Sequence, residues 1–260
     1  MEVKNIMKAQ GHWLLAKMGK KVLRPGGKEL TERLVENLKI TENDKVIEFA
    51  PGIGFTANLT LHKNPASYIG VDADEEAVEL LNNKFFNLNP KPKFINGKAE
   101  NTGLEDQSAT KVYGEALLTM HADHRKELII KEAHRLLETG GLYAIHEIAL
   151  TPNKISDELK AKIQKDLALS ILVNARPLTT DEWTQLLNNA GFDVVYQSLN
   201  GMFLLKFSRM IDDEGFWNTL KIAGNILKSR AATKRILQMY KVFTKHQKYM
   251  QSIVIVARKR

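Results

Sequence analysis

The amino-acid sequence predicts an α/β protein with a doubly wound, mostly parallel seven-stranded sheet and a helical cap. From residue 45 onward, short apolar stretches alternate with stretches whose apolar residues repeat at helical spacing, and this alternation is typical of parallel sheets covered by helices. The connections between these stretches are short. The chain of 260 residues, 43% of them hydrophobic, is long enough for one large domain.

We expect the first 27 residues to form one helix and a loop that cover a ligand site. Residues 3–20 carry apolar residues at helical spacing and end near Gly19. The following sequence RPGG, at 24–27, is typical of a loop.

The main body of the domain is expected to span residues 28–200. It opens with a helix over 28–38, after which strands and helices alternate. The expected strands are 45–50, 67–72, 93–96, 110–118, 142–150 and 193–198, and the expected helices are 55–63, 74–86, 125–141, 155–173 and 179–192, the last with an N-cap at Thr179 or Thr180 near Glu182.

Residues 201–250 are interpreted as a helical cap inserted before the last strand of the sheet, 251–260. Residues 201–260 hold 13 Lys and Arg against 3 Asp and Glu, so this segment carries a net charge of +10 and residues 1–200 carry −2, which gives the total of +8. An amphipathic cap with a solvated basic face explains the pattern, and so does a membrane-surface helix within 220–250. RNA binding ranks last, because few aromatic residues are available for base stacking.

Composition restricts the remaining function classes. The chain has no cysteine, which excludes disulfides and thiolate chemistry. It has no run of about 18 uncharged apolar residues, and its first residues lack the apolar stretch of a signal peptide. We therefore expect a cytoplasmic enzyme, with no metal site indicated.

The stretch 46–57, VIEFAPGIGFTA, joins an apolar strand to a helix through small residues. Gly52 and Gly54 fit the dinucleotide-binding fingerprint, with Asp72 eighteen residues after Gly54. Glu48, inside the end of the strand, needs a partner that a cationic ligand could supply. The loop alone leaves a nucleotide site and a tight turn without a ligand both open.

Four motifs in order resemble the class I S-adenosylmethionine-dependent methyltransferases. EFAPGIG (48–54) resembles the glycine loop, with Ala50 in place of the first glycine, and YIGVDADEEAVELL (68–81) resembles the second-strand motif. The stretches 94–121 and 133–147 resemble the two later blocks. The resemblance covers about residues 28–200 and is closest to the small-molecule branch of methyltransferase type 11/25, which includes the quinone C-methyltransferases.

The resemblance implies a Rossmann-like fold, S-adenosylmethionine as cofactor and S-adenosylhomocysteine as product. It implies that Asp72 binds the ribose hydroxyls, that Ala73 lies beside the adenine, and that Glu48 favours the ammonium end. Lys98 departs from the family, which often has an aspartate there. The implied cofactor-binding residues are Glu48, Ala50, Pro51, Gly52, Gly54, Asp72, Ala73, Lys98, Ala99, Glu100, Glu115 and Ala116.

A general base is needed only if the acceptor arrives protonated. Candidates for contact with the reacting atoms are His121, after the fourth strand, together with Glu115 and His12. On the substrate side we expect Trp13, Arg176 and His146, with Glu147 and Asn174 as further polar candidates.

The sequence favours methyl transfer by in-line displacement to a small molecule, and a lipophilic acceptor is one option. An NAD-dependent oxidoreductase remains open, and so does a nucleic-acid methyltransferase or nucleic-acid-binding protein on the same fold. The N/D-P-P-Y/F pattern of base methyltransferases is absent, since GEAL (114–117) stands in its place. A catalytically silent scaffold is the last alternative. The acceptor atom and the oligomeric state are not determined by the sequence.

Overall fold

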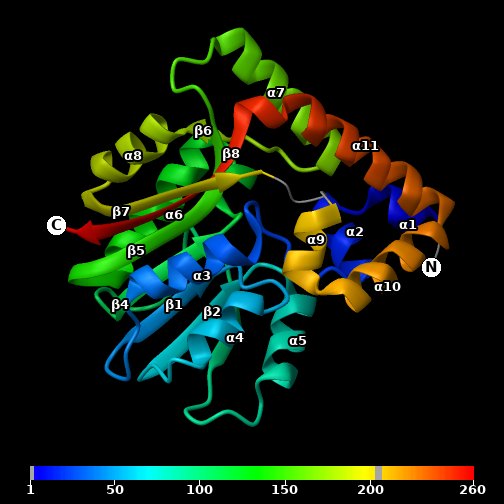
Figure 1. The fold of residues 1–260 in the computed structure, drawn as a ribbon. Helices are drawn as coiled ribbons and strands as arrows, with labels where there is room; N and C mark the ends of the chain where they lie inside the picture. The colour runs from blue at the N-terminus through cyan, green and yellow to red at the C-terminus, as the bar shows by residue number, and fades with distance from the viewer. Residues whose placement is uncertain (1–2, 203–206) are drawn as a thin grey trace.

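A computed structural model describes residues 3–202 and 207–260 and confirms the predicted fold class. One sheet has the strand order β3-β2-β1-β4-β5-β8-β7, as Figure 1 shows. The last strand, β8, pairs antiparallel with both of its neighbours, whereas the pairs from β3 to β5 are parallel. The seven strands are β1 (Lys45–Phe49), β2 (Ser67–Asp72), β3 (Lys93–Asn96), β4 (Ala109–Glu115), β5 (Leu137–Leu150), β7 (Phe192–Gly201) and β8 (Met250–Lys259); a short β6 (Leu178–Thr179) pairs with β5.

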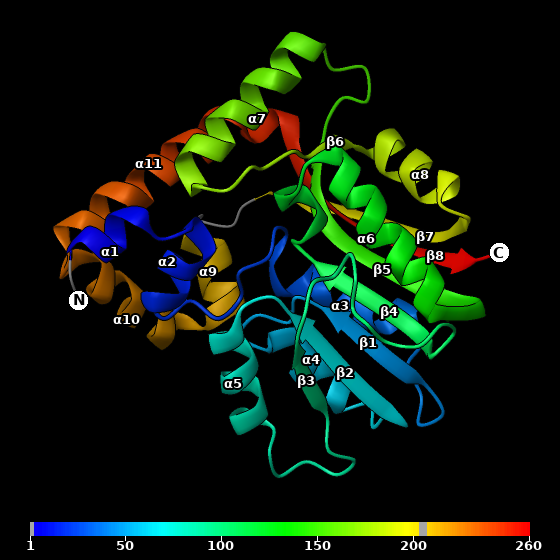
Figure 2. The same ribbon diagram turned by 180° about the vertical axis from the view of Figure 1, so that it is seen from behind.

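Helices cover both faces of the sheet, as a doubly wound fold requires. Leu30 and Leu34 of α3 lie in one core layer with residues of α4 and α5. Ile129 of α6 and Trp183 of α8 lie in the layer on the opposite face, which Figure 2 shows from behind. The bounds are α3 (Gly27–Leu38), α4 (Phe55–Leu61), α5 (Glu75–Lys84), α6 (Asp123–Leu136) and α8 (Thr180–Asn189).

Two details of the core differ from or add to the expectation. The helix expected over 125–141 ends at Leu136, because Leu137 already pairs with Ala109 in the sheet. The cap expected at Thr179 is present as a capping box with Glu182, in which each side chain accepts a hydrogen bond from the other residue's backbone.

The prediction of a single helix over 3–20 is wrong. The structure has two helices, α1 (Val3–Lys8) and α2 (Gly11–Lys17), separated by an extended Gln10. Gly11 approaches Ile171 and Met239 so closely that a Cβ on it would lie 3.0 Å from atoms of both side chains. The break turns α2 onto the cap, a tertiary contact that helical spacing in the sequence does not encode.

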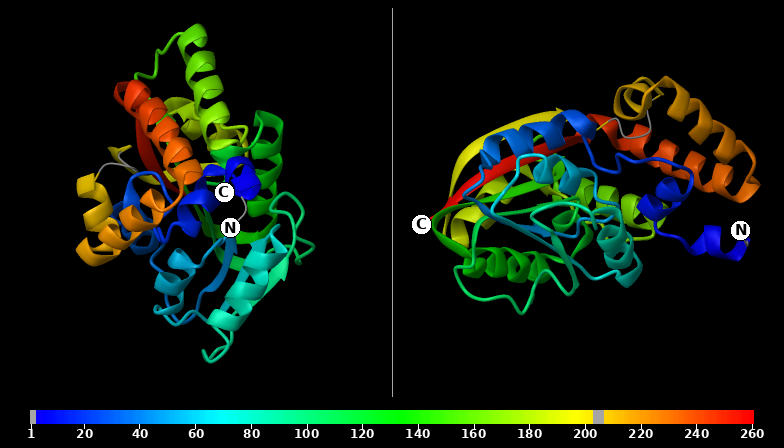
Figure 3. Two further views of the ribbon diagram at one scale, coloured as in Figure 1. Left: turned by 90° about the vertical axis from the view of Figure 1, so that its right-hand side faces the viewer. Right: turned by 90° about the horizontal axis from the view of Figure 1, so that it is seen from below.

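The cap lies beyond the carboxyl ends of β1, β2 and β4, and Figure 3 shows its helices at the end of the molecule opposite the C-terminus. It consists of α1 and α2 together with α7 (Asp157–Ile171), α9 (Phe207–Glu214), α10 (Phe216–Leu227) and α11 (Arg230–His246), and a short turn, η2 (Gln247–Tyr249), leads from α11 into β8. Across residues 3–202 and 207–260, no helix is both long enough and apolar enough to cross a bilayer.

Candidate active site

The loop after β1 contains two glycines with different structural tasks. Both have a positive φ, 58° at Gly52 and 74° at Gly54, which favours glycine. A Cβ on Gly54 would lie 2.4 Å from Leu81 of α5, so this glycine is required for helix packing. A Cβ on Gly52 would meet nothing nearer than 4.0 Å. Gly52 therefore faces open space, and its lack of a side chain leaves room for a ligand.

Asp72, at the end of β2, fixes this loop to the neighbouring strand. One carboxylate oxygen accepts a hydrogen bond from the Gly52 N–H at 3.0 Å, and the other accepts one from the Asp74 N–H at 3.0 Å. Burial raises the pKa of Asp72 from its ordinary value. Each oxygen keeps a second lone pair, so Asp72 can accept two further hydrogen bonds from a diol.

A cavity of about 700 Å³ opens at the carboxyl ends of β1, β2 and β4. This is the edge where open α/β sheets bind ligands, and the volume lies in the range typical of small-molecule sites. Three segments line it: the loop and strand ends (Ala50, Gly52, Ile53, Asp72, Ala73, Asp74 and Glu75), the N-terminal segment (Gln10, His12, Trp13, Leu23 and Arg24), and the segment after β4 (Glu115, Ala116, Leu117, Met120 and His121).

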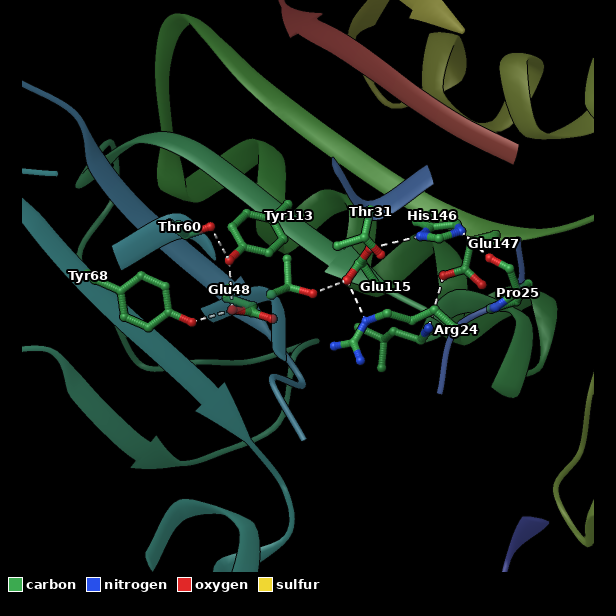
Figure 4. Close-up of polar contacts among 12 residues, drawn as sticks. Arg24, Pro25, Thr31, Glu48, Thr60, Tyr68, Tyr113, Glu115, His146 and Glu147 are labelled. Atoms are coloured by element: carbon green, nitrogen blue, oxygen red, sulfur yellow. Dashed lines mark hydrogen bonds and ion pairs between the residues drawn. The ribbon is translucent and has the colours of Figure 1, made fainter. Parts of the chain in front are cut away.

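Glu115 is the centre of a buried network beside this cavity (Figure 4). One carboxylate oxygen accepts hydrogen bonds from Thr31 at 2.8 Å and contacts His146 Nδ1 at 2.8 Å. The other accepts hydrogen bonds from Arg24 Nε and from the Thr56 hydroxyl. Burial opposes ionisation, but the Arg24 charge and these hydrogen bonds lower the pKa of Glu115 to about 2.

This network argues against Glu115 as a general base, while its contact with the reacting atoms stays a prediction. Its four lone-pair sites are occupied, and a carboxylate with a pKa of about 2 is a poor proton acceptor near neutral pH. Glu115 is better described as the anchor of Arg24.

Sequence reasoning missed Arg24, which it placed in an unassigned loop. Its Nε is bound to Glu115, 91 residues away in the chain, and Arg24 is among the residues that line the cavity. The only signal in the sequence is one arginine beside a Pro-Gly-Gly turn, which does not identify the distant partner.

Glu48 lies in a second buried network, to the left of Glu115 in Figure 4. It accepts hydrogen bonds from the Tyr68 hydroxyl and, at 2.7 Å, from the Tyr113 hydroxyl. Burial, only partly offset by these bonds and by Arg24, raises the pKa of Glu48 to about 7. Glu48 is not among the residues that line the cavity. In this structure two tyrosines are its partners, and the expectation that it favours the ammonium end of the cofactor stays a prediction.

His146 also departs from the expectation, because it is fully buried and does not line the cavity. Its Nδ1 contacts Glu115, and its Nε2 contacts the Pro25 carbonyl oxygen. The adjacent Glu147 accepts hydrogen bonds from the backbone N–H groups of Leu117, Leu118 and Thr119, at 2.7 to 3.0 Å. His146 and Glu147 therefore hold segments that line the cavity in place through hydrogen bonds, without lining it themselves.

Comparisons with known proteins agree with this geometry. A family model described as a methyltransferase domain matches residues 46–141. An uncharacterized protein of Haemophilus influenzae is 33% identical over 96% of this chain and 98% of its own length. The uncharacterized methyltransferase sll0829 of Synechocystis is 27% identical over 68% of this chain and 80% of its own.

Solved structures share the fold. The MccD protein superposes with a TM-score of 0.70 at 21% identity, covering 91% of this chain and 99% of its own. A geranyl diphosphate methyltransferase in complex with SAM superposes with a TM-score of 0.67 at 13% identity, covering 89% of this chain and 85% of its own. The chain belongs to the class I S-adenosylmethionine-dependent methyltransferases. S-adenosylmethionine is accordingly its cofactor, while nothing specifically favours the quinone C-methyltransferase branch.

Several predicted residues of this methyltransferase line the cavity together. Of the expected cofactor residues, Ala50, Gly52, Asp72, Ala73, Glu115 and Ala116 do so, and so do His12, Trp13 and His121.

Other expected residues lie elsewhere in this methyltransferase. Lys98 is exposed, Glu100 pairs with Arg125 at 2.6 Å, and the exposed Arg176 lies 3.8 Å from Asp123. Neither these residues nor Pro51, Gly54, Ala99, Asn174 and His146 line the cavity.

Two histidines of the methyltransferase line the cavity. His12 lies on α2 and His121 follows the turn η1 (Leu118–Met120) after β4. Burial lowers the pKa of both, and Arg125 lowers that of His121 further. Both imidazoles are therefore neutral near pH 7 and able to accept a proton. Within the described residues, no three His, Asp or Glu side chains are grouped so as to hold a metal ion.

Proposed function

We propose that this methyltransferase methylates a small-molecule acceptor held in the cavity between the β1 loop and α2. The observation that carries the proposal is that Gly52, Asp72 and the α2 side chains of His12 and Trp13 line one cavity of about 700 Å³, with open space at Gly52. When bound, S-adenosylmethionine supplies an electrophilic methyl group on a sulfonium. The chain's own task is to hold and align the two reactants and to exclude water.

The lining suggests a division of labour for cofactor binding. Asp72 would accept hydrogen bonds from the ribose diol through its remaining lone pairs. Arg24 would bind the carboxylate of the methionine part, because it lines the cavity and its Nε is held by Glu115, which leaves the two terminal nitrogens of the guanidinium to donate. Ala73 would lie beside the adenine, as the family resemblance implies.

The charge of the cavity favours a small acceptor over a nucleic acid. Its lining contains Asp72, Asp74, Glu75 and Glu115 but, among the described residues, a single arginine and no lysine. Such a lining cannot neutralise a run of phosphates. The apolar side chains of Trp13, Leu23, Ile53, Leu117 and Met120 favour an acceptor with a substantial apolar part.

Isothermal titration with S-adenosylhomocysteine, and separately with NAD⁺, tests the cofactor assignment. We expect binding of the first compound only. Asp72→Asn should weaken it by about 1–3 kcal/mol, the cost of losing a buried hydrogen-bond partner. Asp157→Asn, an exposed position in the first turn of α7, is the matched control and should bind as the wild type does. Preferential binding of NAD⁺ would refute the proposal.

The two cavity histidines can be separated by their pH profiles once an acceptor is found. Because burial holds the pKa of His121 below its ordinary value, turnover that depends on it should persist below pH 6.5 and fall only as the imidazole becomes protonated. The variant His121→Asn should lose this acidic limb and about two orders of magnitude in kcat. His12→Asn is the parallel variant, and an unchanged kcat in either one removes that histidine as the base.

A further inference from the structure

The outward face of α10 is apolar and exposed. Trp217 is 80% and Leu227 is 76% exposed, and Phe216 and Leu220 are also exposed. At 100° per residue these positions fall on one side of the helix, in a sector of about 100°. The rings of Phe216 and Trp217 stack edge to face with centroids 5.4 Å apart, so the face presents a compact aromatic end.

The opposite side of α10 is fully used by the fold. Ile222 is buried in a core cluster with Leu14 of α2 and with Met18, the residue that follows α2. Asn225 donates a hydrogen bond to the Met18 carbonyl at 3.0 Å. Because these contacts fix the rotation of the helix, its apolar side is held outward, where the rest of the described chain does not cover it.

The surroundings of this face are strongly basic. Residues 216–249 contain eight Lys and Arg and no Asp or Glu. Lys221 and Lys228 border the apolar sector, on the same side of the helix as Trp217. A cleft of about 590 Å³ next to the end of α10 is lined by Lys17, Lys228 and Arg230, among others. An apolar helix face with a cationic border matches the chemistry of an anionic bilayer surface.

We propose that this face, Phe216, Trp217, Leu220 and Leu227, docks on the surface of an anionic lipid bilayer. The helix lies along the interface, its apolar side chains enter the boundary between headgroups and acyl chains, and Lys221 and Lys228 meet lipid phosphates. The proposal goes beyond the methyl-transfer function. A membrane-surface helix was expected within 220–250, and the proposal places the membrane contact on α10 and not on α11. Met239 and Phe243 of α11 are buried in a core cluster with residues of α7.

Other occupants fit the observations less well. A second copy of the chain docked face to face would bring Lys221 and Lys228 of the two copies together, which is electrostatically unfavourable. A nucleic acid would meet aliphatic side chains over half of this face, which do not stack with bases. A bilayer satisfies both the apolar centre and the cationic rim.

Docking in this way would bring the cavity close to the lipid. Leu14 of α2 and the following Met18 share a core cluster with Ile222 of α10, while His12 and Trp13 of α2 line the cavity. A single helix therefore separates the proposed docking face from the site.

Vesicle flotation of the full chain tests the proposal. The wild type should float with vesicles of phosphatidylglycerol and phosphatidylcholine, should not float with phosphatidylcholine alone, and should be released by high salt. The double variant Trp217→Ser/Leu227→Ser should lower the apparent affinity at least about tenfold. Replacing Lys221 or Lys228 by Gln should lower it about fivefold each.

Phe86→Ser is the matched control, because Phe86 is an exposed aromatic residue on the loop after α5 and its loss should leave flotation unchanged. S-adenosylhomocysteine binding by every variant verifies that it is folded, so a failure of the docking proposal is distinct from a failure of the cofactor assignment. Absence of flotation by the wild type, or equal flotation by the double variant, overturns the proposal. A self-association or an RNA affinity that the double variant abolishes, without vesicle binding, assigns the face to that partner instead.

Discussion

Glu48 and Glu115 occupy comparable places and have opposite electrostatic character. Each lies at or next to the last residue of a strand, β1 and β4 respectively, and these strands are neighbours in the sheet. Both side chains are buried. The pKa of Glu48 is raised to about 7, whereas that of Glu115 is lowered to about 2.

The difference comes from the partners, because burial raises both pKa values. Two neutral tyrosine hydroxyls donate hydrogen bonds to Glu48, and they do not offset its desolvation. Glu115 has the guanidinium of Arg24 in direct contact, in addition to two threonine hydroxyls. Since Arg24 belongs to the N-terminal loop, the charged state of Glu115 depends on how that loop packs over the cavity, and the charged state of Glu48 depends far less on it.

The largest expected effect is that of Arg24→Met, which removes the charge that distinguishes the two sites. Glu115 would then be a buried carboxylate without its guanidinium partner. Breaking a buried ion pair in this way lowers the free energy of unfolding by about 3–5 kcal/mol. Urea unfolding at neutral pH measures the change.

Arg260→Met is the control, because the exposed Arg260 side chain forms a surface ion pair with Asp193 at 3.2 Å and a hydrogen bond to the Asn188 carbonyl oxygen at 2.7 Å, and its loss should cost less than about 1 kcal/mol. Equal losses in the two variants would show that the Arg24–Glu115 pair does not differ from a surface pair.

A second experiment compares Glu48→Gln and Glu115→Gln across pH. Because the folded-state pKa of Glu48 lies above its ordinary value of 4.5, its stabilising contribution is complete below pH 4.5 and is lost as pH rises to about 7. Between about pH 4 and pH 8, Glu48→Gln should therefore gain up to about 3 kcal/mol relative to the wild type. Urea unfolding at both pH values measures this gain.

Glu115→Gln should behave in the opposite way. The lowered pKa of Glu115 stabilises the fold above pH 4.5, and this contribution is lost as pH falls towards about 2. The variant should be less stable than the wild type at neutral pH, with the gap narrowing in acid. A common slope for both variants would contradict the assigned partners.

The sequence predicted those parts of the site that depend on local chain geometry. Asp72 and Gly52 were identifiable because a strand, a small-residue loop and an acid at the end of the next strand follow each other at family spacing. The doubly wound, mostly parallel sheet followed from the same alternation and is confirmed.

Partners that come from distant segments were not predictable in the same way. Glu48 was expected to be buried and in need of a partner, but its tyrosines are 20 and 65 residues away. Their identity depends on the register of β1 with β2 and β4, which a single sequence does not specify. Predicting the role of Arg24 would have required knowing the path of an irregular loop. Its importance becomes visible from its contact with Glu115.

The smallest expected effect is on cofactor affinity, and it again separates the two glutamates. Glu115→Gln keeps one acceptor oxygen but loses the charge that holds Arg24 Nε, so the guanidinium is less well oriented for the methionine carboxylate. We expect S-adenosylhomocysteine to bind about 1 kcal/mol more weakly, as for one weakened hydrogen bond. Glu48→Gln changes no residue that lines the cavity and should leave the affinity within about 0.5 kcal/mol. Titration calorimetry at a pH where both variants are folded gives the two values; equal weakening in both would mean that Arg24 is not oriented by Glu115 for ligand binding.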